Sequence, residues 1–184
     1  KGAPEVTSID GWSVKPRGRM LYDIANLSSV PSNVDIPGEG FSTEARRIRI
    51  GIQGTMPGGF GYKLETDITD GTSLVDAYID FKTNGVKITL GQHRNFQSFE
   101  ELTNSNESSF IEKTAFTDAF GFQRKLGISA AFSFESALDT INIQTGVFSD
   151  NLDDLDDGNK ALSLDFRAFI SPVINNMQMH FGGS

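Results

Sequence analysis

The segment "ARRIRIGIQGTMPGGF" at residues 45–60 alternates isoleucine with arginine and other polar residues. Successive side chains of a β-strand point to opposite faces, so the isoleucines share one face and the arginines share the other. The residues concerned are Ile48, Ile50, Ile52, Arg47 and Arg49. An apolar face opposite a charged face is typical both of a half-buried strand in a soluble sheet and of a strand in a membrane barrel.

The same period of two recurs along the chain, whereas the 3.6-residue period of a helix is almost absent. Turn signals such as the Asn-Gly pair in "TNG" at 83–85 separate the alternating segments. The pattern predicts strands over residues 15–25, 43–56, 60–68, 74–82, 86–93, 122–134, 139–148 and 162–171, with a ninth beginning near residue 177. We therefore expect an all-β, antiparallel, up-and-down sheet that forms one domain over residues 1–184.

Composition narrows the classes of protein that this sequence could encode. No window approaches 18 consecutive apolar residues, which excludes a helical membrane span, but barrel strands carry only alternating hydrophobicity. The 15 phenylalanines suit strands, and the absence of cysteine excludes disulfides and thiolate metal sites. A net charge of −8, with the bases inside the strands, excludes the basic surface patch of a nucleic-acid partner.

The connections and the two faces of the strands favour the membrane barrel. Several predicted connections are short, such as "PGG", "TNG" and "ESA", while others are long and polar or acidic. Short turns on one rim and long loops on the other are typical of outer-membrane barrels. The apolar faces carry essentially no charge, as a lipid-facing band requires. The alternative is a soluble or structural β-barrel that binds a small ligand and has no channel activity.

If the isoleucines face lipid, the basic side chains of the opposite faces line an aqueous lumen. A guanidinium stays charged and offers a planar fork to oxyanions such as phosphate, so a column of bases would attract anions. The predicted pore-lining bases are Arg17, Arg19, Arg47, Arg49, Lys63, Lys87, Lys125 and Arg167. In the alternative interpretation these bases only pair with carboxylates of the same face: Asp23, Glu65, Asp67, Asp76, Asp80 and Asp165. Arg46 has the parity of the apolar face, at a strand end where its long side chain can reach the headgroups.

Residues 96–120 interrupt the strand pattern with a long segment that is rich in both phenylalanine and glutamate. We expect this segment to fold inward as a constriction loop, with its phenylalanines packed on the wall and its glutamates near luminal arginines. The phenylalanines are Phe96, Phe99, Phe110 and Phe116. The candidate site residues of the loop are Glu100, Thr103, Ser105, Ser108 and Ser109, whose serine hydroxyls could hydrogen-bond an anion.

Enzymatic chemistry finds little support in the sequence. His93 and His180 lack carboxylates or cysteines at metal-ligand spacing. The acidic stretch "DNLDDLDDGN" at 150–159 lacks the twelfth-position glutamate of a calcium loop, although its charge could bind lipopolysaccharide through bridging divalent ions. We expect no enzyme, no metal site and no cofactor.

Five stretches together resemble the phosphate-selective porin O and P family. They are "RRIRIGIQGTMPGGFGYKLETDI", "DAYIDFK", "GQHRNFQSFEELTNSNESSFIE", "TDAFGFQRKLGISAAFS" and "GVFSDN", and the resemblance extends from about Trp12 to the end. It implies the N-terminal half of a sixteen-stranded, homotrimeric channel of the bacterial outer membrane, surrounded by lipid and lipopolysaccharide. It also implies a ladder of luminal arginines that passes inorganic anions or other small solutes.

The sequence departs from this family at the long loop. Phosphate-selective members carry a lysine in the segment that corresponds to Thr103–Phe110, and this chain has "TNSNESSF", without a base. A weaker anion preference and a broad small-solute channel therefore stay open beside phosphate selectivity.

Overall fold

The computed structural model describes residues 3–27, 40–104, 106–108, 110, 113–120, 123–135, 139–149, 162–175 and 177–184. Its long strands are β2 (Ser13–Leu27), β3 (Gly40–Met56), β4 (Phe60–Asp67), β5 (Ser73–Thr83), β6 (Val86–Arg94), β7 (Arg124–Glu135), β8 (Asp139–Phe148) and β9 (Ser163–Ile174). The short elements are β1 (Val6–Thr7), β10 (Met177–Gln178), β11 (Phe181–Gly183), α1 (Phe99–Leu102) and α2 (Ala115–Ala119). In these ranges no helix has the length and apolar character needed to cross a membrane.

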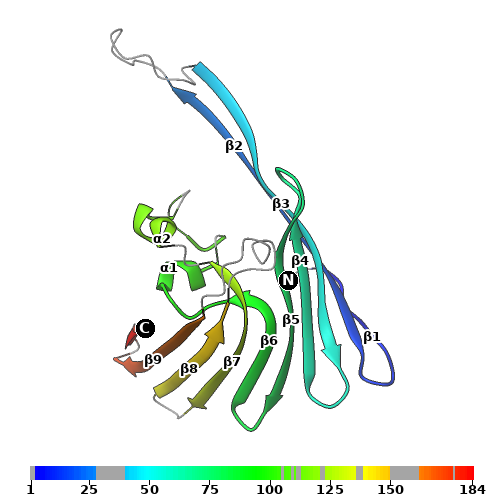
Figure 1. Cartoon of the computed structure of the whole chain (residues 1–184), viewed down its shortest axis with the longest axis vertical. Helices are drawn as coiled ribbons and strands as arrows, with labels where there is room; N and C mark the ends of the chain where they lie inside the picture. The colour runs from blue at the N-terminus through cyan, green and yellow to red at the C-terminus, as the bar shows by residue number, and fades with distance from the viewer. Residues whose placement is uncertain are drawn as a thin grey trace.

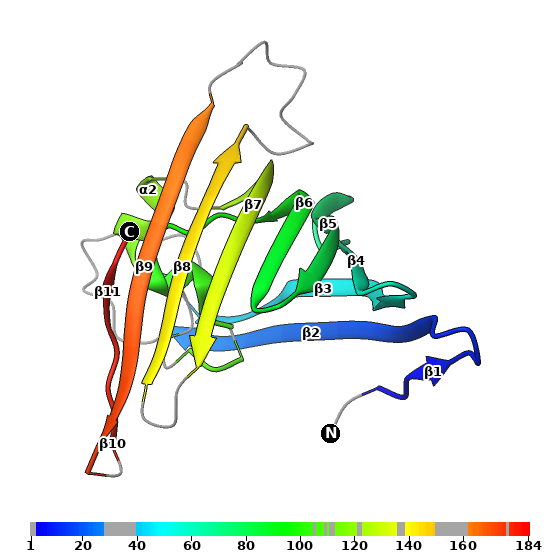
Figure 2. The same cartoon turned by 90° about the horizontal axis from the view of Figure 1, so that it is seen from below.

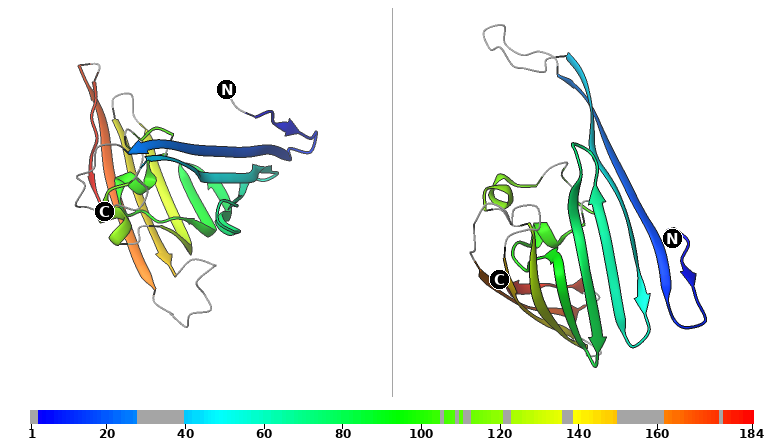
Figure 3. Two further views of the ribbon diagram at one scale, coloured as in Figure 1. Left: turned by 90° about the horizontal axis from the view of Figure 1, so that it is seen from above. Right: turned by 45° about the vertical axis from the view of Figure 1, so that its right-hand side comes forward.

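The strands form one antiparallel sheet in which sequence neighbours are also spatial neighbours. The order runs from β1 to β10, and β11 returns to pair with β9. The sheet curves, and α1 and α2 lie inside the curve, while β2 and β3 project far beyond the neighbouring strands (Figure 1). Figure 2 shows the same curvature from below, and Figure 3 shows β2 and β9 at opposite sides of an open sheet. The all-β antiparallel prediction is confirmed, and the sheet is not closed within the described residues.

The eight long strands agree with the predicted segments to within a few residues at each end. The ninth predicted strand begins at Met177 as expected, but it is interrupted, because the chain forms two short strands, β10 and β11, instead of one continuous strand. Asn175 adopts a positive φ of 51°, which turns the chain back onto β9. Gly182 then lies so close to Phe169 that an added Cβ would be 2.4 Å from the Phe169 Cβ. The alternating pattern does not predict β1, which pairs with the start of β2.

Apolar and charged side chains lie on opposite faces of the sheet. Ile50, Leu64 and Ile79 on the outer face are 51%, 47% and 51% exposed, as expected for side chains that do not pack in a protein core. On the inner face, Glu65 and Asp76 are only 8% and 4% exposed. An exposed apolar surface of this extent marks contact with another apolar phase, and the charged face needs water or partners.

A small apolar cluster lies on the inner face where the long loop leaves the sheet. Phe148 is completely buried, and its ring lies 5.9 Å from that of Phe96 and 5.1 Å from that of His93, between centroids. The ring fits there because two glycines lie beneath it. An added Cβ at Gly127 would be 2.5 Å from Phe148 Cδ1, and one at Gly146 would be 2.7 Å from Phe148 Cε2.

We predict that Gly127→Ala lowers the free energy of unfolding by about 1–3 kcal/mol, because the new methyl group would overlap both the Val147 carbonyl oxygen and the Phe148 ring. Urea titration of the protein in detergent measures this change. Gly18→Ala is the matched control, since its Cβ would meet no atom closer than 3.8 Å. An equal loss of stability in both variants would contradict the close packing of Phe148 on Gly127.

Candidate functional site

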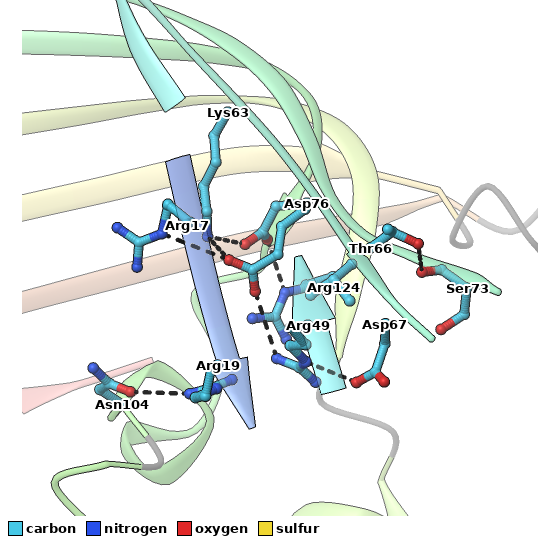
Figure 4. Close-up of polar contacts among 12 residues, drawn as sticks. Arg17, Arg19, Arg49, Lys63, Thr66, Asp67, Ser73, Asp76, Asn104 and Arg124 are labelled. Atoms are coloured by element: carbon cyan, nitrogen blue, oxygen red, sulfur yellow. Dashed lines mark hydrogen bonds and ion pairs between the residues drawn. The ribbon is translucent and has the colours of Figure 1, made fainter. Parts of the chain in front are cut away.

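The inner face carries a network of ion pairs centred on the buried carboxylate of Glu65. This carboxylate lies 3.2 Å from Lys63 Nζ, 3.7 Å from Arg17 Nε and 3.8 Å from Arg49 Nη1. Arg49 also has a second carboxylate partner on β4. It lies opposite Asp67 in the register, and the Arg49 Nε donates to Asp67 Oδ2 at 2.8 Å. Three bases from three strands thus converge on one carboxylate. Figure 4 shows these three bases, Arg17, Arg49 and Lys63.

Asp76 on β5 extends the network toward the long loop. It lies opposite Glu65 in the register and accepts hydrogen bonds from Lys63 Nζ and from Arg124 Nε, the latter at 2.8 Å. The Nη1 atom of Arg124 also lies 3.6 Å from Glu101 Oε1 in α1. Glu101 is 2% exposed, so the network joins the sheet to the loop through a buried charge.

Further contacts attach the start of the loop to several strands. The Arg94 Nη1 donates to the Leu102 carbonyl at 2.8 Å, and the Arg19 Nη1 donates to Asn104 Oδ1 at 3.3 Å. The Gln97 Nε2 donates to Asp165 Oδ1 at 2.9 Å. The segment that contains α1 therefore lies across the inner face and contacts β2, β6, β7 and β9.

A cavity of about 280 Å³, called the basic cavity here, lies between the loop and the wall. Six bases and one carboxylate line it, together with two loop asparagines and one glycine: Arg17, Arg19, Arg49, Lys63, Arg94, Arg124, Glu65, Asn104, Asn106 and Gly18. Such an excess of guanidinium and ammonium groups over carboxylates attracts anions, and the guanidinium forks can bind oxyanions through paired hydrogen bonds.

Two further cavities share lining residues with the basic cavity. The polar cavity, of about 290 Å³, shares Lys63, Arg94 and Arg124 with it. The large cavity, of about 490 Å³, shares Lys63, Tyr78 and Lys87 with the polar cavity. The inner face thus offers a series of neighbouring spaces, each lined by at least three basic side chains.

Only some of the predicted pore-lining bases line the basic cavity. Arg17, Arg19, Arg49 and Lys63 line the basic cavity, and Lys87 lines the two neighbouring cavities. Arg47 lies opposite Leu21 on β2, and Lys125 lies opposite His93 on β6. Arg167 is 8% exposed, and its guanidinium stacks on Phe99 and Phe169 at 5.8 Å and 5.2 Å from the ring centroids. This contact attaches α1 to β9.

Ion pairs within the inner face, the alternative raised by the sequence, also occur. Besides the contacts of Glu65 and Asp76, Lys87 Nζ lies 3.2 Å from Asp80 Oδ2. Asp165 instead accepts a hydrogen bond from Gln97, and Asp23 lies 3.6 Å from Arg46 Nε. Arg46 reaches Asp23 because the register shifts between Leu21 and Tyr22, so Arg46 does not take the lipid-side position that strict alternation predicts.

Three residues that line the basic cavity are not among the site residues predicted from the sequence: Arg94, Arg124 and Asn104. Strict alternation along β6 places Arg94 with Leu90 on the apolar face, but Gly91 has a φ of +123° and disturbs the alternation. Arg94 and Arg124 lie opposite each other in the register, at the two points where the long loop leaves and rejoins the sheet. A glycine inside a strand followed by bases on both sides of a long loop is the signal that could have found them.

The predicted loop residues mostly stabilise the loop itself. Glu100 accepts hydrogen bonds from the hydroxyls of Thr117 and Thr114, which hold the pKa of its carboxyl below the ordinary value. The Thr103 hydroxyl donates to the Phe99 carbonyl at 2.9 Å. The contact expected between a loop glutamate and a luminal arginine is made by Glu101, with Arg124.

The remaining loop predictions have mixed outcomes. The Ser108 hydroxyl donates to the Phe110 carbonyl at 3.1 Å, while Ser105 and Ser109 lie outside the described residues. Phe96 is buried against Phe148, as expected. Phe110 and Phe116 are 77% and 63% exposed, so their predicted packing on the wall is wrong for the described residues. Phe116 packs on Phe120 of its own helical segment instead.

Lys113 supplies a base from the loop although the stretch 103–110 has none. Its ammonium donates to Glu101, the same carboxylate that Arg124 contacts. Burial and, after it, the positive charges of nearby arginines together lower the pKa of Lys113 from its ordinary value to about 8. These arginines are Arg124, Arg47, Arg94 and Arg49.

Comparison with known proteins assigns the chain to a family. A family model described as phosphate-selective porin O and P matches residues 14–184. A protein of Caulobacter vibrioides, described as uncharacterized, is 37% identical over 194 residues, and this match covers 100% of the present chain and 38% of that protein. The chain thus spans well under half the length of this relative. The match over nearly the whole chain shows that it belongs to the phosphate-selective porin O and P family.

Proposed function

We propose that the chain forms part of the wall of a water-filled β-barrel channel in the bacterial outer membrane, and that this channel passes small solutes with a preference for anions. The observation that carries the proposal is the basic cavity, where six basic side chains and one carboxylate face one space. The electrostatic energy of an anion falls when it enters this space, and that of a cation rises. Arginine supplies most of the charge and stays protonated at every physiological pH.

The ion pairs of the inner face favour passage over tight binding. Glu65 and Asp76 already occupy donors of Arg49, Lys63 and Arg124, so an anion has to compete with these carboxylates. Conduction requires sites that bind strongly enough for entry and weakly enough for release. Partial pairing of the bases meets both conditions.

The proposal includes a closed barrel. Exposed backbone groups at a sheet edge cost several kcal/mol each in lipid, so the sheet edges have to be paired, by further strands of a longer chain, by strands of a partner or by closure of the present strands on themselves. The greater length of the Caulobacter vibrioides relative leaves room for further strands. The proposed channel has sixteen strands and forms a homotrimer surrounded by lipid and lipopolysaccharide, as the resemblance to the family implies. The half-exposed outer isoleucines and leucines support the membrane setting over a soluble ligand-binding barrel.

Residues 96–120 are proposed as the constriction of this channel. The contacts of Arg19 with Asn104, of Arg94 with Leu102 and of Arg124 with Glu101 support this role, because they hold the loop against the basic cavity. The solutes are small anions, among which phosphate-type oxyanions suit the guanidinium forks. The stretch 103–110 contains no base, but Lys113 gives the loop a positive charge at neutral pH.

Arg19 lines the basic cavity, so its charge should contribute to the anion preference. Arg19→Gln should lower the permeability ratio of chloride to potassium about two- to fivefold, because a unit charge at 4 Å in water is worth about 1 kcal/mol. The reversal potential of the reconstituted protein in a tenfold KCl gradient measures this ratio. Arg19→Lys keeps the charge and should keep most of the chloride preference.

Arg46→Gln is the matched control, because Arg46 pairs with Asp23 and does not line the basic cavity. We expect less than a third of the Arg19→Gln effect. An unchanged reversal potential in Arg19→Gln, with a normally folded barrel, would remove the basic cavity as the source of anion preference.

The charge of the loop residue Lys113 should make the chloride preference depend on pH. Since the pKa of Lys113 is about 8, its ammonium is mostly charged at pH 7 and mostly neutral at pH 9. The chloride preference should therefore fall as the pH rises from 7 to 9. Lys113→Met should show the lower preference already at pH 7, and Lys113→Arg should keep the higher preference up to pH 9. An identical pH profile in all three proteins would contradict the role of Lys113.

A further inference from the structure

We propose that the polar cavity, which adjoins the basic cavity, binds a hydroxylated organic anion such as a sugar phosphate. This inference rests on the proposed channel function and adds a class of solute to it. A sugar phosphate carries two chemical features: an anionic group that needs bases, and a chain of hydroxyls that needs both donors and acceptors. The lining of the polar cavity offers both.

The neutral lining distinguishes the polar cavity from the basic cavity. Besides bases and Asp76, the polar cavity has five neutral side chains that form hydrogen bonds: Tyr78, Thr89, His93, Ser129 and Gln144. The basic cavity has only Asn104 and Asn106 of this kind. These five side chains come from β5, β6, β7 and β8, so they form a wall across four neighbouring strands.

The hydrogen bonds of His93 determine whether the Ser129 hydroxyl donates or accepts. The His93 Nδ1 lies 2.8 Å from the Gly91 carbonyl, which can only accept, so this nitrogen carries the proton. In the neutral ring Nε2 is then the acceptor, and the Ser129 hydroxyl donates to it at 2.7 Å. The proton of Ser129 is thus engaged while its oxygen lone pairs remain able to accept a hydrogen bond from a solute hydroxyl.

Gln144 supplies a second acceptor. Its side-chain oxygen Oε1 is buried and has no hydrogen-bond partner among the described residues. A buried acceptor without a partner costs free energy, and this cost falls when a solute donates a proton to it. A sugar hydroxyl can donate, whereas chloride cannot. Gln144 therefore favours hydroxylated anions over simple ones.

The anionic group of the same solute finds bases within reach. Lys63, Arg94 and Arg124 line both the polar cavity and the basic cavity, so they can hold a phosphate between the two. The polar cavity of about 290 Å³ is close to the lower limit of small-molecule pockets, about 300 Å³. Lys63, Tyr78 and Lys87 also line the adjoining cavity of about 490 Å³, which gives room for a longer molecule.

The test measures how added solutes reduce the chloride current through the reconstituted protein. Three probes separate the two features: glucose 6-phosphate has charge and hydroxyls, inorganic phosphate has the charge, and glucose has the hydroxyls. We expect glucose 6-phosphate to halve the current at a concentration at least tenfold below that of either other probe. Equal half-blocking concentrations for glucose 6-phosphate and inorganic phosphate would overturn the proposal.

Gln144→Leu tests the residue that carries the argument. The half-blocking concentration of glucose 6-phosphate should rise about three- to tenfold, as expected for one lost hydrogen bond, while that of inorganic phosphate changes less than twofold. The urea midpoint should stay unchanged or rise, because the variant removes a buried acceptor that lacks a partner. Loss of folding stability without a change in block would show a purely structural role and overturn the proposal.

Thr145→Val is the matched control on the opposite face. Thr145 follows Gln144 on β8 and pairs with Ala130 and Phe166, so it points away from the polar cavity, and no change in block is expected. The chloride reversal potential, measured in the same membranes, reports the channel function separately. A chloride-selective channel without preference for glucose 6-phosphate refutes this inference alone, whereas a current without chloride preference refutes the proposed function.

Discussion

The structure depends on two carboxylates, Glu65 and Asp76, that are buried among bases on the inner face of the sheet. Three bases lie around Glu65, and two donate to Asp76. Removing one partner from such a buried group leaves an uncompensated charge, which typically costs about 3–5 kcal/mol. Each strand from β2 to β5, together with β7, contributes a member of this set, so the charges constrain the register and the curvature of the sheet together. The side chains of the outer face do not constrain the register in this way, because aliphatic side chains can exchange neighbours freely in an apolar phase.

The same charges determine where the long loop lies. Arg124 contacts Asp76 with one nitrogen and approaches Glu101 with another, so the position of α1 depends on an arginine that the sheet already holds. On the other side of the loop, Arg167 stacks on Phe99, an apolar contact to a cation. The loop is therefore attached through its first helix at two sites that differ in chemistry. Salt screens charge attraction between exposed groups strongly but screens buried pairs much less, so the attachment of Glu101 to Arg124 persists at high ionic strength.

The sequence predicts the strands well and the site only in part. Alternation identified β2 to β9 because a lipid-like outer face and a charged inner face both require a period of two. It failed wherever the backbone breaks that period. The register shift beside Leu21 turns Arg46 inward, and Gly91 allows Arg94 to reach the loop. Arg167 stacks on Phe99, and this contact depends on the folded loop, which no local pattern reveals. The neutral wall of Thr89, Ser129 and Gln144 was missed because its members are far apart in sequence and common in strands.

Pairing and anion attraction, which the sequence presents as alternatives, are compatible on this surface. A base that carries no partner would be costly in the folded protein and would hold an anion too long to conduct. A base that is fully neutralised would not attract anions. Lys63 illustrates the intermediate case, because it contacts both Glu65 and Asp76 and lines all three cavities. In the proposed channel, an arriving anion would compete with two carboxylates for one ammonium, and its departure would restore the original contacts without leaving a buried charge alone. Exchange between equivalent partners keeps the free-energy change of each step small, which is the condition for rapid passage.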